Sequence, residues 1–116
     1  MKKARQFDAS DHELLTNSES WKIICSGLPV ESAESNDHAH KKWMKSNSDS
    51  HAQREILLAL KGETTCSLNG KCFETIPGTL FLFDNFEKHD NGYSPNTNSI
   101  KHLWLSLLGR KIIVRI

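Results

Sequence analysis

The sequence predicts an all-β fold, a small barrel or sandwich of roughly seven or eight short strands. Turn residues such as Gly, Pro, Asn and Asp recur about every ten positions, which is the spacing typical of such folds. Almost no stretch shows the helical periodicity of apolar residues. The 116 residues are enough for one domain with its own core but leave no room for a second folded domain.

The first twenty residues are polar, and we expect them to form an arm (residues 1–20) outside a barrel formed by residues 21–116. Ser10 and Glu13 have the spacing of a capping box, which favours one short turn of helix in the arm. The segment Trp21–Leu28 is apolar enough to be the first strand.

The stretch from residue 29 to residue 49 is rich in Ser, Asn, Asp, Lys and His and predicts a loop. We expect at most a brief strand pairing at Trp43 and Met44. His38 and His40 have the spacing of a metal-binding pair. Their polar and charged neighbours indicate a solvated loop, so both are predicted to be surface residues.

The strands predicted after this loop are residues 54–61, 64–68, 71–75, 80–84, 100–108 and 112–116. The strand 54–61 is a continuous apolar run, as expected where a strand is covered on both faces. A period of two places Glu55 and Leu57 on one face and Ile56 and Leu58 on the other.

Asn69-Gly70 is the strongest hairpin signal in the chain, and it joins the strands 64–68 and 71–75. This turn pairs Leu68 with Lys71, Ser67 with Cys72 and Cys66 with Phe73. Opposed residues share a face, so Cys66 and Cys72 point to opposite sides and cannot form a disulfide with each other. We expect all three cysteines to be free thiols.

The strand 100–108 alternates His102, Trp104 and Ser106 on one face with leucines on the other. A small barrel points alternate residues inward, so one of these faces lines the interior, and the sequence does not decide which. An inward Trp104 would offer a ligand a flat apolar wall with one N–H donor, or would only pack the core.

Charge and hydropathy exclude several classes of protein. The 15 basic and 14 acidic residues give a net charge of +1, which is too small for binding a phosphate backbone, so we expect no direct contact with nucleic acid. There is no apolar run long enough for a membrane span and no apolar segment of a secretory signal. We therefore expect a cytoplasmic protein without a membrane partner.

The residues Asp49, His51, Glu55 and Gly62 resemble the first motif of the cupin, or jelly-roll, family. That motif contains a His-x-His pair, then a Glu, then a Gly. Asp49 stands where the first His is expected, so the chain departs from the family pattern at one position.

The second cupin motif, a Pro-x-Gly turn followed by a His, is similar to Pro77-Gly78 and His89 at the longer spacing found in regulators. The strand Lys101–Ser106 resembles one that often follows the sensor barrel of AraC-type transcription regulators, with Ser106 in place of a His. Over roughly residues 21–108, the chain therefore resembles the N-terminal effector-binding domain of the AraC family.

This resemblance implies a cupin barrel, also called a double-stranded β-helix, that binds a small-molecule effector, forms a homodimer and takes part in transcription regulation. It also implies helix-turn-helix modules after the barrel. This sequence lacks them, so DNA would be bound only through a missing C-terminal domain. On this reading we expect no enzymatic activity and no cofactor.

We expect the effector to bind inside the barrel. The residues predicted to bind it are His51, Glu55, His89, His102 and Trp104. The effector would order the N-terminal arm over itself and change how the DNA-binding part is presented. The sequence does not rank a sugar, a phenolic compound and a nucleoside as effectors.

Two alternatives stay open. A metal ion held by His51, Glu55 and His89, with Asp49 in place of the first His, would make the chain a metal-dependent cupin enzyme of the dioxygenase or isomerase type. Imidazole and carboxylate ligands suit Fe, Mn, Ni or Zn. A barrel interior filled by its own side chains would instead leave a dimerisation module.

Overall fold

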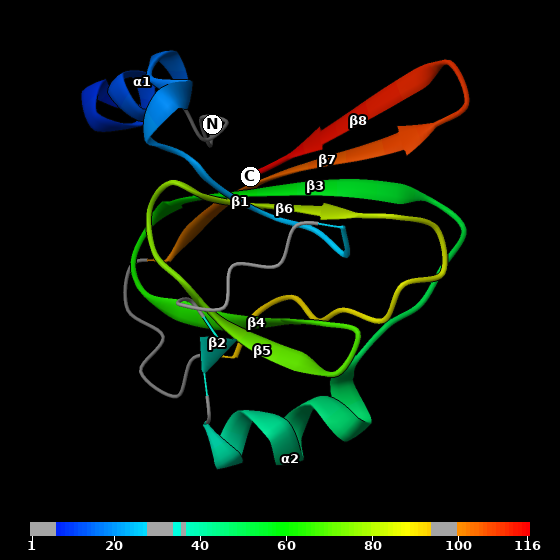
Figure 1. Cartoon of the computed structure of the whole chain (residues 1–116). Helices are drawn as coiled ribbons and strands as arrows, with labels where there is room; N and C mark the ends of the chain where they lie inside the picture. Colours follow the sequence, from blue (N-terminus) through cyan, green and yellow to red (C-terminus); the bar gives the residue numbers. More distant parts are fainter. Residues whose placement is uncertain (1–6, 28–33, 36, 94–99) are drawn as a thin grey trace, which may run out of the picture.

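Two β-sheets face each other in the computed structural model (Figure 1), which describes residues 7–27, 34–35, 37–93 and 100–116. The strands are β1 (Lys22–Ile24), β2 (Glu34–Ser35), β3 (Arg54–Lys61), β4 (Thr64–Leu68), β5 (Lys71–Thr75), β6 (Thr79–Phe83), β7 (Lys101–Leu108) and β8 (Lys111–Arg115). The larger sheet has the order β1-β6-β3-β7-β8, and the smaller has the order β2-β5-β4. Only the pairing of β1 with β6 is parallel among these strands.

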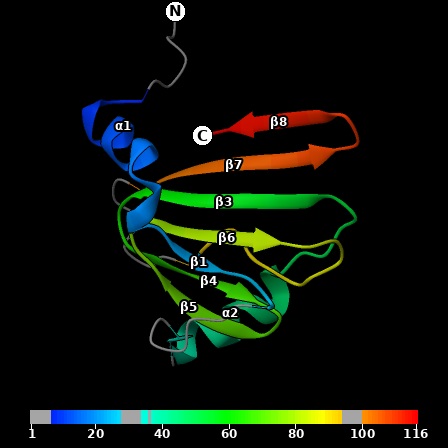
Figure 2. The same ribbon diagram turned by 45° about the horizontal axis from the view of Figure 1, so that its top comes forward.

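The predicted all-β class is confirmed, but the described strands form two separate sheets and do not close into a barrel. Strands β1 and β8 are the two edges of the larger sheet (Figure 2). Every residue of β8 is exposed, because the hairpin of β7 and β8 leans away from the smaller sheet (Figure 1).

The main core lies between the two sheets. The larger sheet contributes Ile24, Leu57, Phe81 and Phe83, and the smaller sheet contributes Cys66, Leu68 and Phe73, all at most 4% exposed. Phe81 stacks on Phe83 with ring centroids 5.4 Å apart and meets Phe73 edge-on at 6.2 Å. Burial of each large apolar side chain contributes about 1.5–3 kcal/mol, so this layer holds the sheets together.

The strand predictions from residue 54 onward agree with the structure to within one residue at each end. The predicted hairpin register is also confirmed, with Ser67 opposite Cys72 and Cys66 opposite Phe73. Asn69 and Gly70 both adopt positive φ, which a two-residue hairpin turn requires. All three cysteines are free, as predicted.

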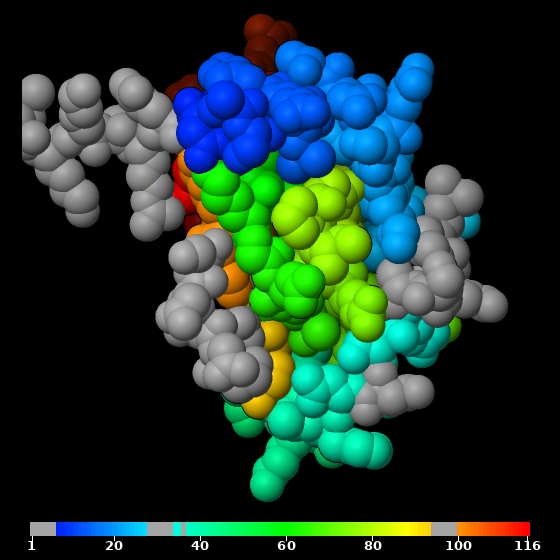
Figure 3. All heavy atoms as spheres, turned by 90° about the vertical axis from the view of Figure 1, so that its left-hand side faces the viewer, coloured from blue at the N-terminus to red at the C-terminus, as the bar shows by residue number. Residues whose placement is uncertain are grey.

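The outer face of the larger sheet is covered at one end by helix α1 (Ala9–Thr16), followed by a short 3₁₀ turn, η1 (Ser18–Ser20). Phe7, Leu14, Leu15 and Trp21 pack against a second apolar cluster on this face, formed by Leu58, Leu60 and Leu80. Figure 3 shows α1, in blue, directly above the atoms of β3 and β6. The predicted arm is therefore packed against the sheet over residues 7–20, on the face away from the interior, and it does not lie over the predicted ligand site there. Residues 1–6 of the arm lie outside the described part.

The N-cap of α1 is Asp8, two residues before the predicted cap, Ser10. The capping box is formed by Asp8 and Asp11, whose carboxylates accept hydrogen bonds from each other's backbone N–H groups, rather than by Ser10 and Glu13. Asp11 is fully buried and binds Lys101 at 2.5 Å. Burial raises the pKa of Asp11, but hydrogen bonds from Lys101 and from the Asp8 backbone outweigh it and hold the pKa below its ordinary value.

The second helix corrects the prediction of a loop. Residues 38–47 form α2 (His38–Asn47), which lies under the smaller sheet (Figure 1). Asp37 caps it by accepting hydrogen bonds from the first turn. Trp43 and Met44 belong to this helix and form no strand, and the Cys72 thiol lies 3.8 Å from the Met44 sulfur. Neither α1 nor α2 in the described ranges is long and apolar enough to cross a membrane.

Candidate functional site

The pairing of β3 with β7 decides which face of each strand looks inward. Glu55 lies opposite Ser106, Leu57 opposite Trp104 and Ala59 opposite His102. Leu57 belongs to the core between the sheets and Trp104 packs against that core. The face of β7 that carries His102, Trp104 and Ser106 is therefore the interior face, which the sequence had left open.

Glu55 is the centre of a polar cluster at one end of this interior, and it is only 6% exposed. Its Oε1 lies 2.8 Å from Nε2 of His51 and 3.3 Å from Nε2 of His89. Its Oε2 accepts hydrogen bonds from the Ser106 hydroxyl at 2.8 Å and from Nη2 of Arg115 at 3.0 Å. We call these five residues the Glu55 cluster.

The two imidazoles of the cluster present the same atom to Glu55. Nδ1 of His51 lies 3.0 Å from the Gln53 carbonyl, and Nδ1 of His89 lies 3.0 Å from the Glu87 carbonyl. A carbonyl only accepts, so each Nδ1 carries a hydrogen. Each Nε2 is then either protonated, and donates to Glu55, or carries a lone pair that is free to bind a cation.

A divalent metal ion fits this arrangement. The three ligand atoms of His51, Glu55 and His89 all lie within 4.8 Å of one another. Metal-binding imidazoles usually donate their other N–H to a carbonyl, as both do here. Asp49 is not part of the group: it pairs with His89 through backbone hydrogen bonds, and its exposed carboxylate accepts from the backbone N–H of Ser50.

An open hollow of about 280 Å³ lies beside the cluster, and we call it the Glu55 hollow. His51, Glu55, Ser106 and Arg115 line it. Trp104 lies against one of these lining residues, because the Arg115 guanidinium lies over the indole ring at 5.7 Å. The cluster is thus accessible to a small molecule and offers it both donors and an acceptor.

Aromatic rings hold the buried side of the cluster in place. Phe83 stacks on His89 with centroids 4.4 Å apart, and on Trp104 at 6.1 Å. The His51 ring meets the His89 ring edge-on at 4.9 Å. This packing ties the orientation of His89 to the main core.

His102 lies at the other end of the interior, four residues before Ser106 and so about 13 Å away along the strand. Its Nε2 is buried and has no hydrogen-bond partner in the described part of the chain. Burial lowers the pKa of His102 to about 4. A separate hollow of about 390 Å³ adjoins it, between Trp43, Thr64 and Tyr93, and we call this the His102 hollow.

A second histidine–carboxylate cluster corrects the surface prediction for His40. His38 is exposed as predicted, but His40 is fully buried, and its Nε2 lies 2.6 Å from Asp90. Its Nδ1 lies 2.8 Å from the Thr65 hydroxyl. Asp90 also accepts hydrogen bonds from the Ser67 hydroxyl and from two backbone N–H groups.

Of the five predicted ligand-binding residues, the structure brings together His51, Glu55 and His89, places Trp104 beside them and sets His102 apart. Sequence reasoning missed Arg115 as a member of the cluster. A signal for it existed, because a two-residue turn at Gly109-Arg110 pairs Trp104 with Arg115. The partnership of His40 with Asp90, 50 residues away, left no local signal.

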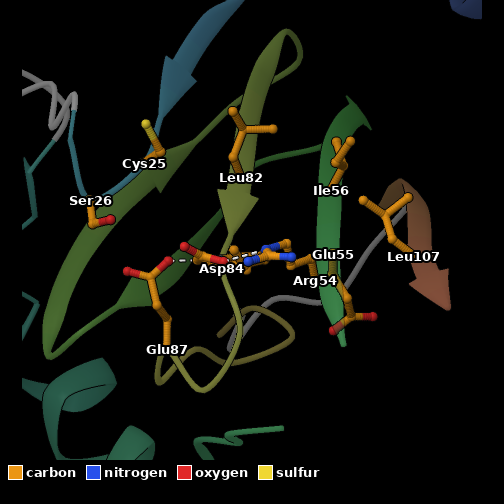
Figure 4. A pocket seen from close by; sticks show the side chains of 10 residues that line it. Cys25, Ser26, Arg54, Glu55, Ile56, Leu82, Asp84, Glu87 and Leu107 are labelled. Atoms are coloured by element: carbon orange, nitrogen blue, oxygen red, sulfur yellow. Dashed lines mark hydrogen bonds and ion pairs between the residues drawn. The ribbon is translucent and has the colours of Figure 1, made fainter. Parts of the chain in front are cut away.

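A third hollow, of about 310 Å³, lies on the outer face of the larger sheet, beyond α1. Figure 4 shows Cys25, Leu82, Ile56 and Leu107 along its upper part and Arg54 with Asp84 across its lower end. Leu82 and Leu107 are each more than a third exposed. This part of the sheet is apolar and is not covered by α1.

Comparisons of the chain with protein-family models, with curated proteins and with solved structures found no match.

Proposed function

We propose that the chain is a small-molecule-sensing domain whose effector binds in the Glu55 hollow. The proposal rests on the Glu55 carboxylate, which is buried but contacts two partly exposed side chains that line an open hollow. The Arg115 side chain is 58% exposed and that of His51 is 27% exposed. The resemblance to effector-binding domains of AraC-type regulators adds support by fold-level analogy.

The cluster suggests how binding could be transmitted. Arg115 belongs to the edge strand β8 and binds Glu55 on β3 across the intervening strand β7. An effector that replaces one partner of this ion pair changes the stability of the contact between β8 and the rest of the sheet. It can shift the equilibrium between two arrangements of β8 only by as much as its affinities for them differ. An attached DNA-binding part would respond to that shift.

The test is a thermal-shift screen of sugars, phenolic compounds and nucleosides against the wild type, Glu55→Gln and Glu74→Gln. Glu74 is an exposed carboxylate on the smaller sheet, so its variant is the matched control. A ligand at a hundred times its dissociation constant stabilises the protein by roughly 2.7 kcal/mol. We expect such a shift in the wild type and the control, and its loss in Glu55→Gln. The proposal fails if no compound shifts the wild type, or if Glu55→Gln keeps the shift.

We also propose that the domain forms a homodimer through the uncovered outer face. Apolar side chains on this face are 36–64% exposed, among them Leu82, Leu107, Ile112 and Val114. Such a row of apolar residues at an open sheet edge is typical of interaction surfaces. Sedimentation should show a dimer that Val114→Lys dissociates and Glu74→Lys leaves intact. A monomeric wild type contradicts this part of the proposal.

The second candidate is a metal-dependent enzyme, and the convergence of three ligand atoms in His51, Glu55 and His89 favours it. A bound Fe, Mn, Ni or Zn ion would supply Lewis-acid or oxygen chemistry. His51, Glu55 and His89 would hold the ion beside the Glu55 hollow. Ser106 and Arg115 would keep the second carboxylate oxygen in place.

Metal analysis of protein purified without chelator separates the two candidates. A stoichiometric transition metal that is lost in His51→Ala but kept in His38→Ala would overturn the sensor proposal. His38 is a suitable control because it is an exposed histidine on α2. Protein without metal that still responds to an effector supports the sensor.

A further inference from the structure

The loop of residues 84–88, which follows β6, directly supports one histidine of the Glu55 cluster. Its Glu87 carbonyl lies 3.0 Å from Nδ1 of His89 and accepts the hydrogen of that atom. This contact turns the opposite ring atom, Nε2, toward the Glu55 carboxylate, 3.3 Å away. The position of the loop therefore decides how the His89 imidazole is presented in the cluster.

The loop needs support from its neighbours, because its backbone is strained. Phe86 adopts a φ of 62°, which bulky residues rarely do, and it is 64% exposed, so its ring gains little from packing. Such a conformation persists only where surrounding contacts hold it. On one side, the Phe86 N–H donates to the His51 carbonyl at 2.7 Å, and its carbonyl accepts from the Ser50 hydroxyl at 2.9 Å.

The Glu87 side chain holds the other side of the loop. Its Oε1 accepts a hydrogen bond from the Asp84 backbone N–H at 2.7 Å, and Figure 4 shows the carboxylate turned toward Asp84. Its Oε2 accepts from Nδ2 of Asn69 at 2.7 Å. One carboxylate thus closes the loop and joins it to the hairpin of β4 and β5.

Asn69 makes two more contacts with the loop from its place in the hairpin turn. Its backbone N–H donates to the Lys88 carbonyl at 2.8 Å. Its side-chain Oδ1 accepts from the Lys88 N–H at 3.2 Å. Both the backbone and the side-chain amide of Asn69 are therefore bound to residues 87 and 88.

The peptide group between Glu87 and Lys88 links Asn69 to His89. Its N–H donates to Oδ1 of Asn69, and its C=O accepts from Nδ1 of His89. A trans peptide group is planar, so its N–H and C=O point in opposite directions and cannot turn independently. The bond from the N–H to Asn69 therefore fixes the direction of the carbonyl that faces His89.

We propose that Asn69 is a positioning residue of the Glu55 cluster, which aims the Glu87 carbonyl at the His89 ring. The importance of this role for binding rests on the proposed function of the cluster. Asn69 belongs to the hairpin of the smaller sheet, whereas the Glu55 carboxylate lies on β3 of the larger one. A shift of the hairpin relative to the larger sheet is thereby passed to His89.

The experiment exchanges the hydrogen-bonding roles of Asn69 and Glu87. In Asn69→Asp two carboxylates face each other, and in Glu87→Gln two amides do. In the double variant, the new amide at position 87 donates to the new carboxylate at position 69, which still accepts from Lys88. Each contact is then restored with donor and acceptor exchanged. Asp tolerates positive φ as Asn does, so the hairpin turn is kept.

The measurement is solvent exchange of the His89 Nδ1 hydrogen, followed by NMR without any ligand. His89 is only 2% exposed, so its hydrogen exchanges slowly while the carbonyl holds it. We expect about tenfold faster exchange in each single variant and a rate within about twofold of the wild type in the double variant. Lys71→Ala, at an exposed residue of the same hairpin, is the matched control and should leave the rate unchanged.

The Nε2 hydrogen of His40, which faces Asp90 at 2.6 Å, separates positioning from general loosening of the fold. Its exchange should be the same in all variants. The proposal is overturned if the wild type has no slowly exchanging Nδ1 hydrogen on His89, or if the single variants exchange like the wild type. It is also overturned if the double variant does not recover, or if His40 exchange accelerates as much as that of His89.

Failure of this inference and failure of the proposed function are distinguishable, because no effector enters the exchange measurement. Unchanged His89 exchange in the single variants refutes the role of Asn69 and leaves the sensor proposal standing. Recovery in the double variant, together with a thermal-shift screen in which no compound binds, refutes the sensor and keeps the role of Asn69.

Discussion

The Glu55 cluster and the His40–Asp90 cluster contain the same kinds of side chain but differ in how they are satisfied. Asp90 and His40 are both inaccessible to solvent, and Asp90 accepts hydrogen bonds at both of its oxygens from two side chains and two backbone N–H groups. Glu55 is equally surrounded, but two of its partners, His51 and Arg115, are partly exposed and line a hollow.

This difference in exposure assigns a structural role to the His40–Asp90 cluster and a binding role to the Glu55 cluster. A buried pair whose polar atoms all have partners inside the protein stabilises the contact between α2 and the smaller sheet, and it offers nothing to a ligand. A carboxylate whose partners can be exchanged for those of a ligand is available for binding. Residue type alone does not distinguish the two clusters, whereas access and hydrogen bonding do.

The largest expected effect is on the closed cluster. Asp90→Ala leaves His40, Ser67 and two backbone N–H groups without their acceptor in a buried place. We expect the free energy of unfolding to fall by about 3–5 kcal/mol, the cost typical of breaking a buried pair. Urea denaturation measures it. A loss below about 1 kcal/mol would show that the cluster is not the structural one.

A smaller effect is expected at the open cluster. In Glu55→Gln the amide still accepts from Ser106 and can donate to one imidazole, so only the charge-assisted part of the contacts is lost. We expect a fall of about 1–2 kcal/mol in the free energy of unfolding, together with loss of effector binding. A stability loss as large as that of Asp90→Ala would erase the distinction between the clusters.

The next largest effect on stability is expected from low pH, through protonation of Asp11. This residue is a buried carboxylate that is paired with lysine instead of histidine. Its pKa in the folded protein is held below its ordinary value of 3.8, so it favours folding above about pH 4. This contribution is lost as the pH falls through the lowered folded pKa. Between pH 5 and pH 2, the stability of the wild type should approach that of Asp11→Asn. Parallel curves for the two proteins would contradict the assignment.

The smallest effect is expected for Asp84→Ala. Asp84 pairs with Arg54 at 2.5 Å, but both side chains are more than half exposed. Water and salt screen such pairs, and their net contribution is close to zero. Urea denaturation should hardly distinguish this variant from the wild type. A marked destabilisation would mean that exposure is a poor guide to the role of a carboxylate in this fold.

The sequence predicted the strands well where local signals were strong. The continuous apolar run of β3, and the Asn69-Gly70 turn with its register, depend on neighbouring residues, and the structure confirms both. It also placed His51, Glu55 and His89 together as one candidate site. These three residues converge because the chain reverses direction twice between them, and the turn residues predict both reversals.

The sequence failed where tertiary contacts decide the structure. Helix α2 has few apolar residues, and His40 faces the sheet only because Asp90 and Thr65 lie there to bind it. The closed barrel was predicted by family resemblance, but the two described sheets stay separate because β8 extends past the smaller one. Contacts between segments far apart in sequence leave no periodic pattern.

The most direct test follows the histidine ring ¹⁵N resonances while the protein is titrated with the compound that gives the largest thermal shift. The resonances of His51 and His89 should move with the titration, whereas those of His40 should stay in place. Movement of His40 together with them, or no movement of His51 and His89, would contradict the division into an open and a closed cluster.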